Sequence, residues 1–381
     1  MLKISNRSLI PPFIVMDVMR AANERAASGS DVLHLEVGQP SSPAPKKVIE
    51  TAQFVLADDK LGYTDALGIS LLREKISGHY RDTYGVNLDP KRIVITSGSS
   101  GGLLLSFLSS FDVGDCVGMA TPGYPAYKNM LKSLGVKVVE VPVDSKSHFQ
   151  LKRKVLDKLS ENLDGLIISS PSNPTGSMIS SSGMRDLVDW CDRRGTRLIS
   201  DEIYHGIVYG EQASTALSYG TDVIIINSFS KYFSMTGWRL GWMVIPESMI
   251  RSIECLAQNL YISPPSLSQM AAVAVFDCMD ELNENVARYR INRDILLEKL
   301  PNAGLERFAP VDGAFYIYAN VSHLTNDSSE FCKRMLSEIG VAMTPGIDFD
   351  GINGKSYVRL CFAGATQDIS QAAARLQKWL I

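Results

Sequence analysis

Residues 228–241 read Ser-Phe-Ser-Lys-Tyr-Phe-Ser-Met-Thr-Gly-Trp-Arg-Leu-Gly and lie between two apolar, β-branched runs at 223–226 and 241–245. Such runs predict buried strands, so Lys231 stands in a hydroxyl-rich loop where a strand ends. Hydroxyl groups and the guanidinium group of Arg239 can bind phosphate oxygens, while a lysine amine can do covalent chemistry. The stretch alone is equally compatible with an ordinary surface lysine, because most lysines are solvated. The rest of the chain has to distinguish the two interpretations.

The composition is that of an ordinary globular protein with two structural units. The chain has 381 residues, more than one hydrophobic core usually organises. Hydrophobic residues make up 45% and charged residues 21%, and the 38 basic and 41 acidic side chains leave a net charge of −3. Because no long run of one charge stands out, nucleic acids and acidic membrane surfaces are not expected as partners.

Cysteine usage and the amino terminus predict a cytoplasmic protein. The six cysteines form no Cys-x-x-Cys pair, which favours buried thiols in a reducing compartment over a disulfide framework. The first residues lack the apolar core of a signal peptide, and the apolar stretches are too short to cross a membrane. The five histidines have no metal-ligand spacing, so no metal site and no catalytic histidine are predicted.

Short apolar runs alternate with helical patterns in the first two thirds of the chain. The runs lie at 93–96, 117–120, 136–141, 166–169, 197–200 and 223–226. Apolar strands that alternate with helices predict an α/β fold with a mostly parallel sheet covered by helices on both faces. In such sheets the ligand binds outside the carboxyl ends of the strands, so the polar residues after each strand are the candidates.

A second organisation begins near residue 264. Long helical patterns and two short strands follow, at 266–279, 284–300, 315–318, 330–339, 357–362 and 369–380. They predict a smaller α+β unit joined by the amino-terminal arm. We therefore expect three segments: 1–45 as the arm and part of the small domain, 46–280 as the large cofactor-binding domain, and 281–381 as the small domain.

Polar residues follow several predicted strands at once. Ser99, Ser100 and Gly101 open a helix, where free N–H groups can bind a phosphate. Tyr124 could stack on a flat ring, and Asn173, held between two prolines, could donate to a ring oxygen. Each feature alone is also compatible with a helix cap, with packing or with a turn.

Asp201 ends another predicted strand and puts a carboxylate at a buried position. An uncompensated carboxylate there is costly, so Asp201 needs a positive partner. A protonated pyridine nitrogen would serve, and a structural ion pair with an arginine is the alternative. Together, the strand ends supply a phosphate seat, a stacking ring, a ring-oxygen donor, a counter-ion and an amine, the requirements of pyridoxal 5′-phosphate.

The motifs that carry these residues are Ser-Phe-Ser-Lys with Arg-Leu-Gly beyond it, Ser-Asn-Pro-Thr-Gly and Asp-Glu-Ile-Tyr. In this order the chain resembles, over nearly its whole length, the class I/II pyridoxal-phosphate aminotransferases of fold type I, which are related to aspartate aminotransferase. The resemblance implies a seven-stranded, mostly parallel sheet and a transaminase that uses a Lys231 Schiff base. It also implies that Lys231 moves the substrate proton, that Asp201 keeps the ring nitrogen protonated, and that Tyr204 and Asn173 bind the ring oxygen.

The resemblance assigns further residues. Tyr124 would stack on the ring, and the phosphate would be held by Ser99, Ser100, Gly101, Ser228 and Arg239. Tyr63 matches a tyrosine that reaches the phosphate of the neighbouring subunit, which implies a homodimer with shared sites. Arg359 and Gly38, with Asn173, would bind the substrate carboxylate, and the arm around Ile14 resembles the segment that closes over substrate.

Departures from the family pattern bear on the substrate. One branch of aspartate aminotransferases places an arginine near the position of Gln258, and another places a lysine where this chain has Gly101. Without either cation an acidic side chain would lack a partner, so a neutral, aromatic or aliphatic amino donor is expected with a 2-oxo acid acceptor. A C–S β-lyase on the same scaffold, a non-catalytic cofactor-binding regulator domain and a catalytically inactive relative are the alternatives.

Overall fold

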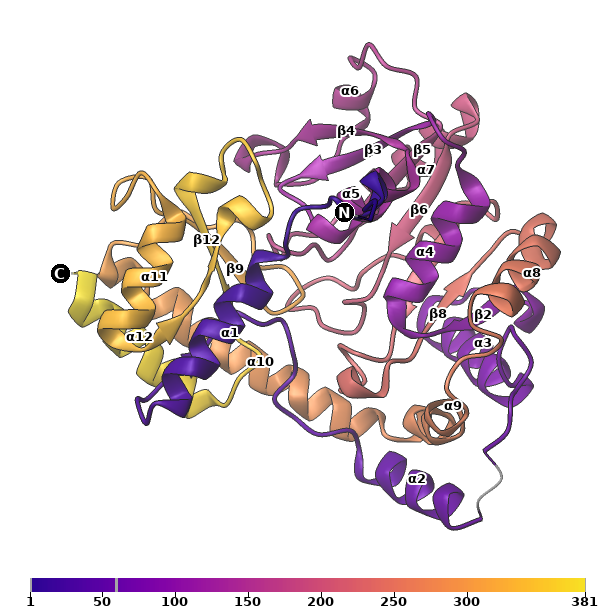
Figure 1. The fold of residues 1–381 in the computed structure, drawn as a ribbon, viewed down its shortest axis with the longest axis horizontal. Helices are drawn as coiled ribbons and strands as arrows, with labels where there is room; N and C mark the ends of the chain where they lie inside the picture. Colours follow the sequence, from indigo (N-terminus) through magenta and orange to yellow (C-terminus); the bar gives the residue numbers. More distant parts are fainter. Residues whose placement is uncertain (1, 59–60, 381) are drawn as a thin grey trace.

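A seven-stranded sheet forms the centre of the larger part of the molecule in the computed structural model, which describes residues 2–58 and 61–380 (Figure 1). In spatial order its strands are β2 (Ile93–Thr96), β8 (Gly241–Val244), β7 (Ile224–Ser228), β6 (Arg197–Asp201), β5 (Gly165–Ser169), β3 (Cys116–Thr121) and β4 (Lys137–Pro142). Strands β3 to β7 are mutually parallel, whereas β8 runs antiparallel to both of its neighbours. The mostly parallel sheet predicted from the sequence is confirmed.

Helices cover both faces of this sheet because alternate strand residues point to opposite sides. Ile224 and Ile226 belong to one hydrophobic cluster, and Ile225 between them belongs to the other. The first face packs against α4 (Gly98–Ser110), α5 (Pro125–Leu134) and α8 (Ile250–Leu260), and the second against α3 (Ser70–Tyr84) and α7 (Ser181–Arg194). The sequence patterns did not single out α7 and α8.

A smaller α+β part lies beside the large sheet (Figure 1, orange and yellow). Its strands β11 (Thr344–Pro345), β12 (Tyr357–Cys361) and β9 (Tyr316–Asn320) form an antiparallel sheet, and β1 (Leu33–His34) pairs in parallel with β10 (Val341–Ala342). Its helices are α1 (Ile14–Ala27), α10 (Met279–Lys299), α11 (Ser328–Ile339) and α12 (Thr366–Leu380). Both α1 and β1 come from the amino-terminal arm, while the domain limits at 45 and 280 stay a prediction.

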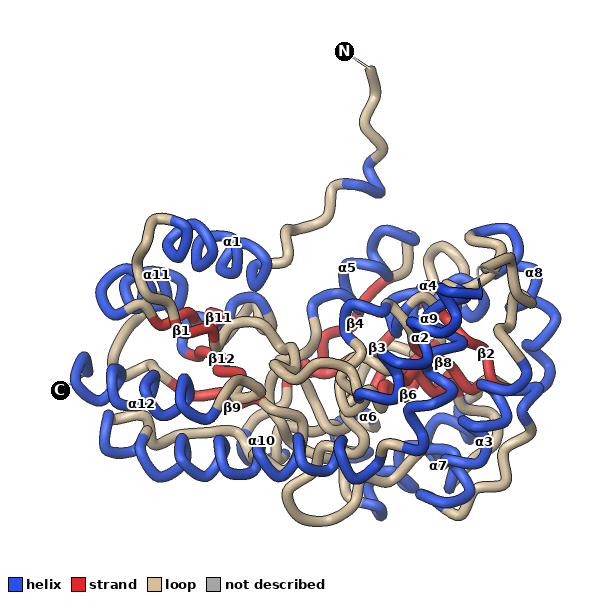
Figure 2. Tube along the Cα trace, turned by 90° about the horizontal axis from the view of Figure 1, so that it is seen from below, coloured by secondary structure: helices blue, strands red, loops and turns tan. Residues whose placement is uncertain are grey.

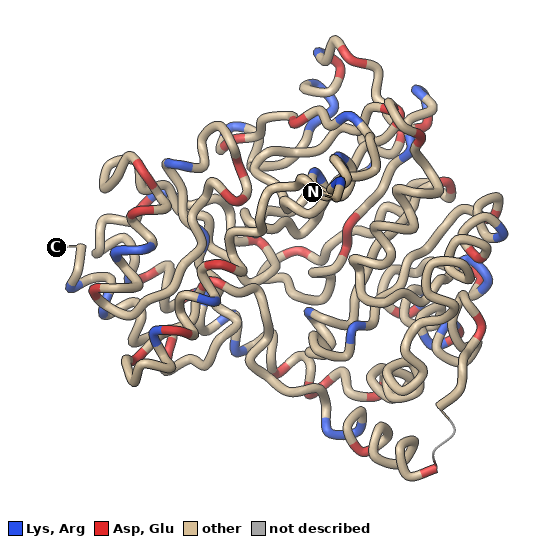
Figure 3. The backbone as a smooth tube through the Cα atoms, in the orientation of Figure 1, with Lys and Arg blue, Asp and Glu red and all other residues tan. Residues whose placement is uncertain are grey.

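The remaining helices are α2 (Lys46–Asp58), α6 (Arg153–Leu156) and α9 (Ser266–Ala272). The single helix predicted over 266–279 is wrong in detail, because a 3₁₀ turn at Val273–Asp277 separates α9 from α10. The amino-terminal segment before α1 passes over α5 at the short 3₁₀ turn Asn6–Ser8, and the residues before this turn extend away from the body of the molecule (Figure 2). Basic and acidic residues are interspersed over both parts (Figure 3), and no helix among the described residues is long and apolar enough to cross a membrane.

Candidate active site

A cavity of about 190 Å³ lies at the carboxyl ends of the parallel strands, where the large sheet, the smaller part and the amino-terminal arm meet. Ten of the site residues predicted from the sequence line this cavity: Gly38, Ser99, Ser100, Tyr124, Asn173, Asp201, Tyr204, Lys231, Arg239 and Arg359. The structure therefore brings together residues that are separated by more than three hundred positions along the chain. Eight of them lie in the large part of the molecule, at or near the ends of its strands. They meet because the carboxyl ends of parallel strands lie at one edge of the sheet.

Four predicted residues do not line this cavity. Gly101 lies deeper in α4, and the Ser228 side chain is turned to the backbone, where its Oγ accepts from Ser230 N at 3.1 Å. Ile14, the first residue of α1, does not line the cavity, whereas its neighbours Phe13 and Val15 do. Tyr63 is 82% exposed and is not among the residues that line the cavity of its own chain.

Lys231 sits in the loop that joins β7 to β8. Ser228 and Gly241 pair directly across the two strands, so both ends of this loop are held by the sheet. The ammonium group points into the cavity and donates a hydrogen bond to the Gly38 carbonyl at 2.6 Å. Burial lowers the pKa of Lys231 to about 8, which makes the neutral, nucleophilic amine accessible near neutral pH.

The Arg239 guanidinium lies against the start of α4. A Cβ atom on Gly98 would come within 2.7 Å of Arg239 Nη2, and Gly98 has a φ of +71° that other residues rarely adopt. Gly241 is equally confined, since its Cβ would meet Ser99 N at 2.8 Å. The two glycines therefore let the guanidinium, the helix amino terminus and the hydroxyls of Ser99 and Ser100 converge as an anion seat.

Asp201 ends β6 and is buried at the floor of the cavity. Its Oδ1 accepts from Ile203 N at 3.1 Å, and its Oδ2 accepts a short hydrogen bond from the Tyr127 hydroxyl. Burial raises the pKa of Asp201 to about 6. In the described part of the chain no arginine or lysine forms an ion pair with Asp201, so the alternative of a structural ion pair is not observed. The carboxylate remains available to a cation bound in the cavity.

Arg359 on β12 is buried, and no carboxylate of residues 2–58 and 61–380 forms an ion pair with it. Its Nη1 donates to Asn173 Oδ1 at 2.9 Å, and its Nη2 donates to Thr344 Oγ1 at 3.3 Å and to the Glu36 carbonyl. Its Nε has no partner, and the Tyr316 ring lies 4.5 Å from its Cζ. A guanidinium group held in this way can receive a ligand carboxylate.

Tyr204 and Tyr316 form a hydroxyl pair beside Lys231. Their Oη atoms are 2.7 Å apart, and both side chains are buried. Tyr316 also confines Gly38, because a Cβ there would lie 1.7 Å from the Tyr316 hydroxyl. Glycine is therefore required at position 38 by close packing as well as by its place at the cavity.

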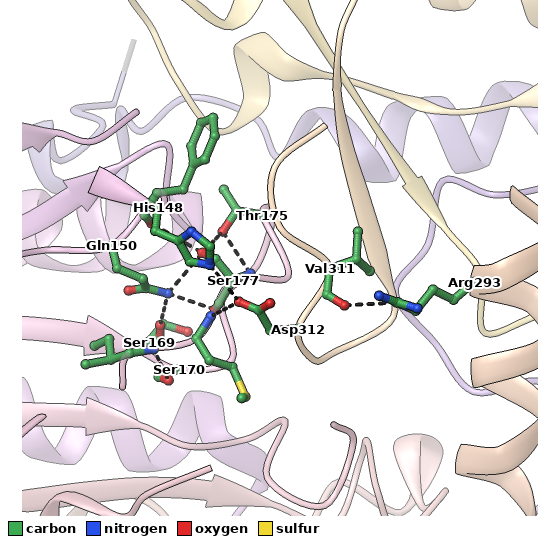
Figure 4. A network of polar contacts seen from close by, with 12 residues as sticks. His148, Gln150, Ser169, Ser170, Thr175, Ser177, Arg293, Val311 and Asp312 are labelled. Atoms are coloured by element: carbon green, nitrogen blue, oxygen red, sulfur yellow. Dashed lines mark hydrogen bonds and ion pairs between the residues drawn. The ribbon is translucent and has the colours of Figure 1, made fainter. Parts of the chain in front are cut away.

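A polar network anchors the loop that carries Asn173 (Figure 4). Gln150 Nε2 donates to the Ser177 carbonyl at 2.8 Å, and Ser177 Oγ lies 2.8 Å from Thr175 Oγ1. From the smaller part, Asp312 Oδ2 accepts from Met178 N at 3.1 Å. The loop is thus fixed from both parts of the molecule, which holds the Asn173 amide beside Arg359.

Sequence patterns alone do not identify several of the residues that line the cavity. Tyr127 lies one helical turn beyond the Gly-Tyr-Pro motif, and Tyr316 was recognised only as part of a strand. Phe13, Val15 and Met16 line the cavity from the arm around the predicted Ile14. The tyrosine after Tyr124-Pro125-Ala126 could have been found by helical spacing, since it shares a face with Tyr124.

The residues present fit pyridoxal 5′-phosphate. Three independent observations support this: the anion seat at Gly98 and Arg239, the buried Asp201 without a cationic partner among the described residues, and the buried Lys231 amine in the same cavity. Arg359, with its unpaired Nε, also lines the cavity and can take a second anionic group. The donor set therefore matches a phosphate, a ring nitrogen, an aldehyde and a substrate carboxylate.

Comparison with known proteins gives an independent result. The family model for aminotransferase class I and II matches residues 30–376. The chain is 46% identical to the valine–pyruvate aminotransferase of Mycobacterium tuberculosis, with 99% of this chain and 98% of the relative covered. It is 36% identical to the (5-formylfuran-3-yl)methyl phosphate transaminase of Methanocaldococcus jannaschii, with 97% and 96% covered.

Among solved structures, an aminotransferase from Mycobacterium tuberculosis matches with a TM-score of 0.98 at 46% identity, covering 100% of this chain and 99% of the other. The two named relatives transfer amino groups between different compounds. The amino donor therefore has to be inferred from the side chains around the cavity.

Proposed function

The chain belongs to the aminotransferase class I and II family, and from this we propose that it transfers the amino group of a neutral, apolar L-amino acid to a 2-oxo acid. It is an aminotransferase of fold type I, and the cofactor of this family is pyridoxal 5′-phosphate. The observation that carries the choice of donor is the apolar wall of the cavity, where the amino-terminal arm faces Val37.

The cations around the cavity are already assigned. Among the described residues only Lys231, Arg239 and Arg359 supply positive charge to its lining. The first is the covalent anchor, the second lies in the phosphate seat, and the third takes the substrate α-carboxylate. An acidic side chain would therefore be desolvated without a partner, at a cost that disfavours aspartate and glutamate.

Part of the cavity lining is apolar, and we call this part the apolar wall. Phe13, Val15 and Met16 of the arm and Val37 before the Gly38 turn line the cavity together. Burial of methyl and methylene groups against such a wall favours aliphatic and aromatic side chains over polar ones. The valine–pyruvate aminotransferase named above supports the same class of donor and a small 2-oxo acid as acceptor.

The residues have distinct tasks in the proposed reaction. The bound cofactor supplies an aldehyde that accepts the amino group and a protonated ring that withdraws electrons. Arg359 would orient the substrate through its α-carboxylate. Lys231 Nζ would take the proton from the substrate Cα and carry it to the cofactor, and the Asp201 carboxylate would balance the positive charge of the protonated ring nitrogen. Tyr204 and Asn173 donate hydrogen bonds to the ring oxygen, and the arm excludes water.

A half-reaction assay tests the proposal. The purified holoenzyme is mixed with valine, leucine, methionine, alanine, phenylalanine, aspartate or glutamate, and the absorbance of the cofactor reports its conversion to the amine form. We expect kcat/KM for the best neutral donor to exceed that for aspartate and glutamate by about a hundredfold. The Lys231→Ala variant should show no conversion, and a preference for aspartate would refute the assignment of the donor. Release of ammonia without consumption of a 2-oxo acid would instead identify a lyase.

We also propose a homodimer with shared sites. Exposed Tyr63 lies in a loop that contacts the segment after α8, where Thr64 N donates to Ser263 Oγ at 3.3 Å and Ile262 is exposed as well. An aromatic and an aliphatic side chain exposed together are typical of an interface. Tyr63 of a second copy would then complete the phosphate seat.

The six free cysteines further support a cytoplasmic location, which cell fractionation tests.

A further inference from the structure

The helix α1, which brings the apolar wall to the cavity, has no capping residue of its own. Its N-cap position is Phe13, whose side chain cannot accept a hydrogen bond from the first turn. The free backbone amides of Ile14 and Val15 instead donate to the carboxylate of Asp348, at 3.0 Å to Oδ1 and 3.3 Å to Oδ2. The helix is therefore capped by a residue more than three hundred positions away in the chain.

Asp348 is suited to this role by its surroundings. It ends the 3₁₀ turn Gly346–Asp348 that follows β11, and only 8% of its surface is exposed. Burial raises the pKa of its carboxyl group, and the hydrogen bonds from the backbone amides of Ile14 and Val15 oppose that rise. No lysine or arginine among the described residues forms an ion pair with Asp348. The two amides and the positive end of the α1 dipole compensate its charge, with a smaller attraction from the Arg359 guanidinium.

The segment that holds Asp348 also contacts the substrate-binding groups. Phe349 lies with its ring 4.7 Å from Arg359 Cζ, and Thr344 Oγ1 accepts from Arg359 Nη2. The Phe349 carbonyl accepts from Gly123 N at 3.1 Å, next to Tyr124. Residues 344–349 thus connect three parts of the site: the arm, the arginine and the loop of the stacking tyrosine.

The wall residues flank the two capped amides. Phe13 precedes them, and its ring packs edge to face on Tyr124 with 5.7 Å between the ring centres. Val15 carries one of the amides, and Met16 follows. Because these side chains belong to the first turn of α1, any loosening of that turn displaces the wall from the cavity.

We propose that Asp348 is a positioning residue that locks the first turn of α1 over the cavity and so determines the preference for branched and long apolar side chains. The substrate class in this statement rests on the proposed function, whereas the lock itself does not. An alanine donor needs little of the wall, while valine and leucine need all of it. Loss of the lock should therefore affect the donors unequally.

Hydrogen exchange of the holoenzyme, followed by mass spectrometry on peptides that contain Ile14 and Val15, tests the lock directly. In Asp348→Ala both amides lose their acceptor, and we expect their exchange to rise about fivefold, as for the loss of a helix cap. Asp348→Asn keeps one acceptor oxygen and should lie between this variant and the wild type. Glu24→Gln removes an exposed carboxylate from the later part of α1 and should leave the exchange unchanged. Equal exchange in all four proteins would overturn the proposal.

Kinetics test the consequence for specificity. In Asp348→Ala the ratio of kcat/KM for valine to that for alanine should fall about fivefold, mainly through KM for valine. The absorbance spectrum of the bound cofactor should stay that of the wild type, because the cap does not touch the phosphate seat or Lys231. An unchanged ratio with faster exchange would leave the lock but refute its role in specificity. If no neutral amino acid is a substrate of the wild type, the proposed function fails while the exchange result still decides the lock.

Discussion

Asp201 and Lys231 illustrate how one physical cause acts on two buried groups with opposite results. Burial raises the pKa of the acid to about 6 and lowers that of the base to about 8. In each case the low dielectric disfavours the charged form. Both groups thus carry a cost in the cofactor-free protein that a bound, complementary charge would relieve, and this couples folding to cofactor binding.

The cost of Asp201 can be measured from its pH dependence. Its folded pKa lies above its ordinary value of 3.8, so burial destabilises the cofactor-free protein increasingly as the pH rises from about 4 to 6, and fully above that range. We expect Asp201→Asn to raise the free energy of unfolding without cofactor by about 2 kcal/mol above pH 6, and by little near pH 4. Urea unfolding at both pH values measures this. The same variant should bind cofactor more weakly, and a pH-independent stability difference would contradict the argument.

Arg359 offers a second test at this scale. In Arg359→Lys the charge remains, but the planar fork, the contact with Tyr316 and the hydrogen bond to Asn173 are lost. We expect kcat/KM for the amino donor to fall on the order of a hundredfold with an unchanged cofactor spectrum. The matched variant Arg307→Lys, at an exposed position of the same part of the molecule, should behave like the wild type. A similar loss in both variants would point to folding as the cause.

Among the elements, β8 has a special place. It runs antiparallel between β2 and β7, so its first residue lies at the same edge of the sheet as the last residues of the parallel strands. Arg239 can therefore act at the cavity although it comes before β8 in the chain, whereas Asp201 is the last residue of β6. The close approach of β8 to α4 depends on Gly98 and Gly241.

A pair of glycine variants separates this packing from backbone strain. Gly98 and Gly85 have nearly equal φ angles of +71° and +69°, but only a Cβ at Gly98 meets Arg239, while nothing lies within 4 Å of one at Gly85. Both alanine variants should lose about 1 kcal/mol of stability. Only Gly98→Ala should weaken cofactor binding, by about tenfold or more, as measured by equilibrium dialysis. Equal binding by the two variants would show that the guanidinium can move aside.

Sequence patterns predicted the elements that depend on local signals. The seven strands of the large sheet were predicted to within about two residues because their apolar runs are continuous, and the residues at their ends could be read from one topological rule. Tyr316, Thr344 and Asp348 could not be predicted in this way. Their roles arise from contacts between distant segments, such as the amides of α1 with a turn after β11, and no local periodicity encodes these contacts.

At the scale of the molecule, the candidate active site lies between two parts that both contribute residues to it. The large sheet supplies the anion seat, the amine and Asp201, and the smaller part supplies Arg359. The loop that carries Asn173 joins them through the hydrogen bond between Asn173 and Arg359 and through the hydrogen bond that Asp312, drawn in Figure 4, accepts from Met178 N. A proposed third contribution comes from Tyr63 of a second copy, which would make the dimer the smallest complete enzyme.

Complementation between two variants tests the shared site. Tyr63→Ala would damage the site of the neighbouring subunit, and Lys231→Ala inactivates the site of its own subunit. Subunit exchange between the two should therefore create one intact site in each mixed dimer, with activity up to about half that of a wild-type dimer. The measurement is the transamination rate of the mixture against each variant alone, with sedimentation to confirm dimers. Absence of recovered activity in confirmed mixed dimers would refute a shared site.

The pairing of Ser228 with Gly241 also bears on the order in which the site is assembled. Closing the loop around Lys231 joins neighbouring strands and costs little chain entropy. Arg359 and Asn173 are 186 residues apart in the chain, so their contact requires a much larger loop to close. We expect the anchor for the cofactor to form early during folding and the substrate-binding arginine late. A nascent chain could then capture its cofactor before it is able to select a substrate.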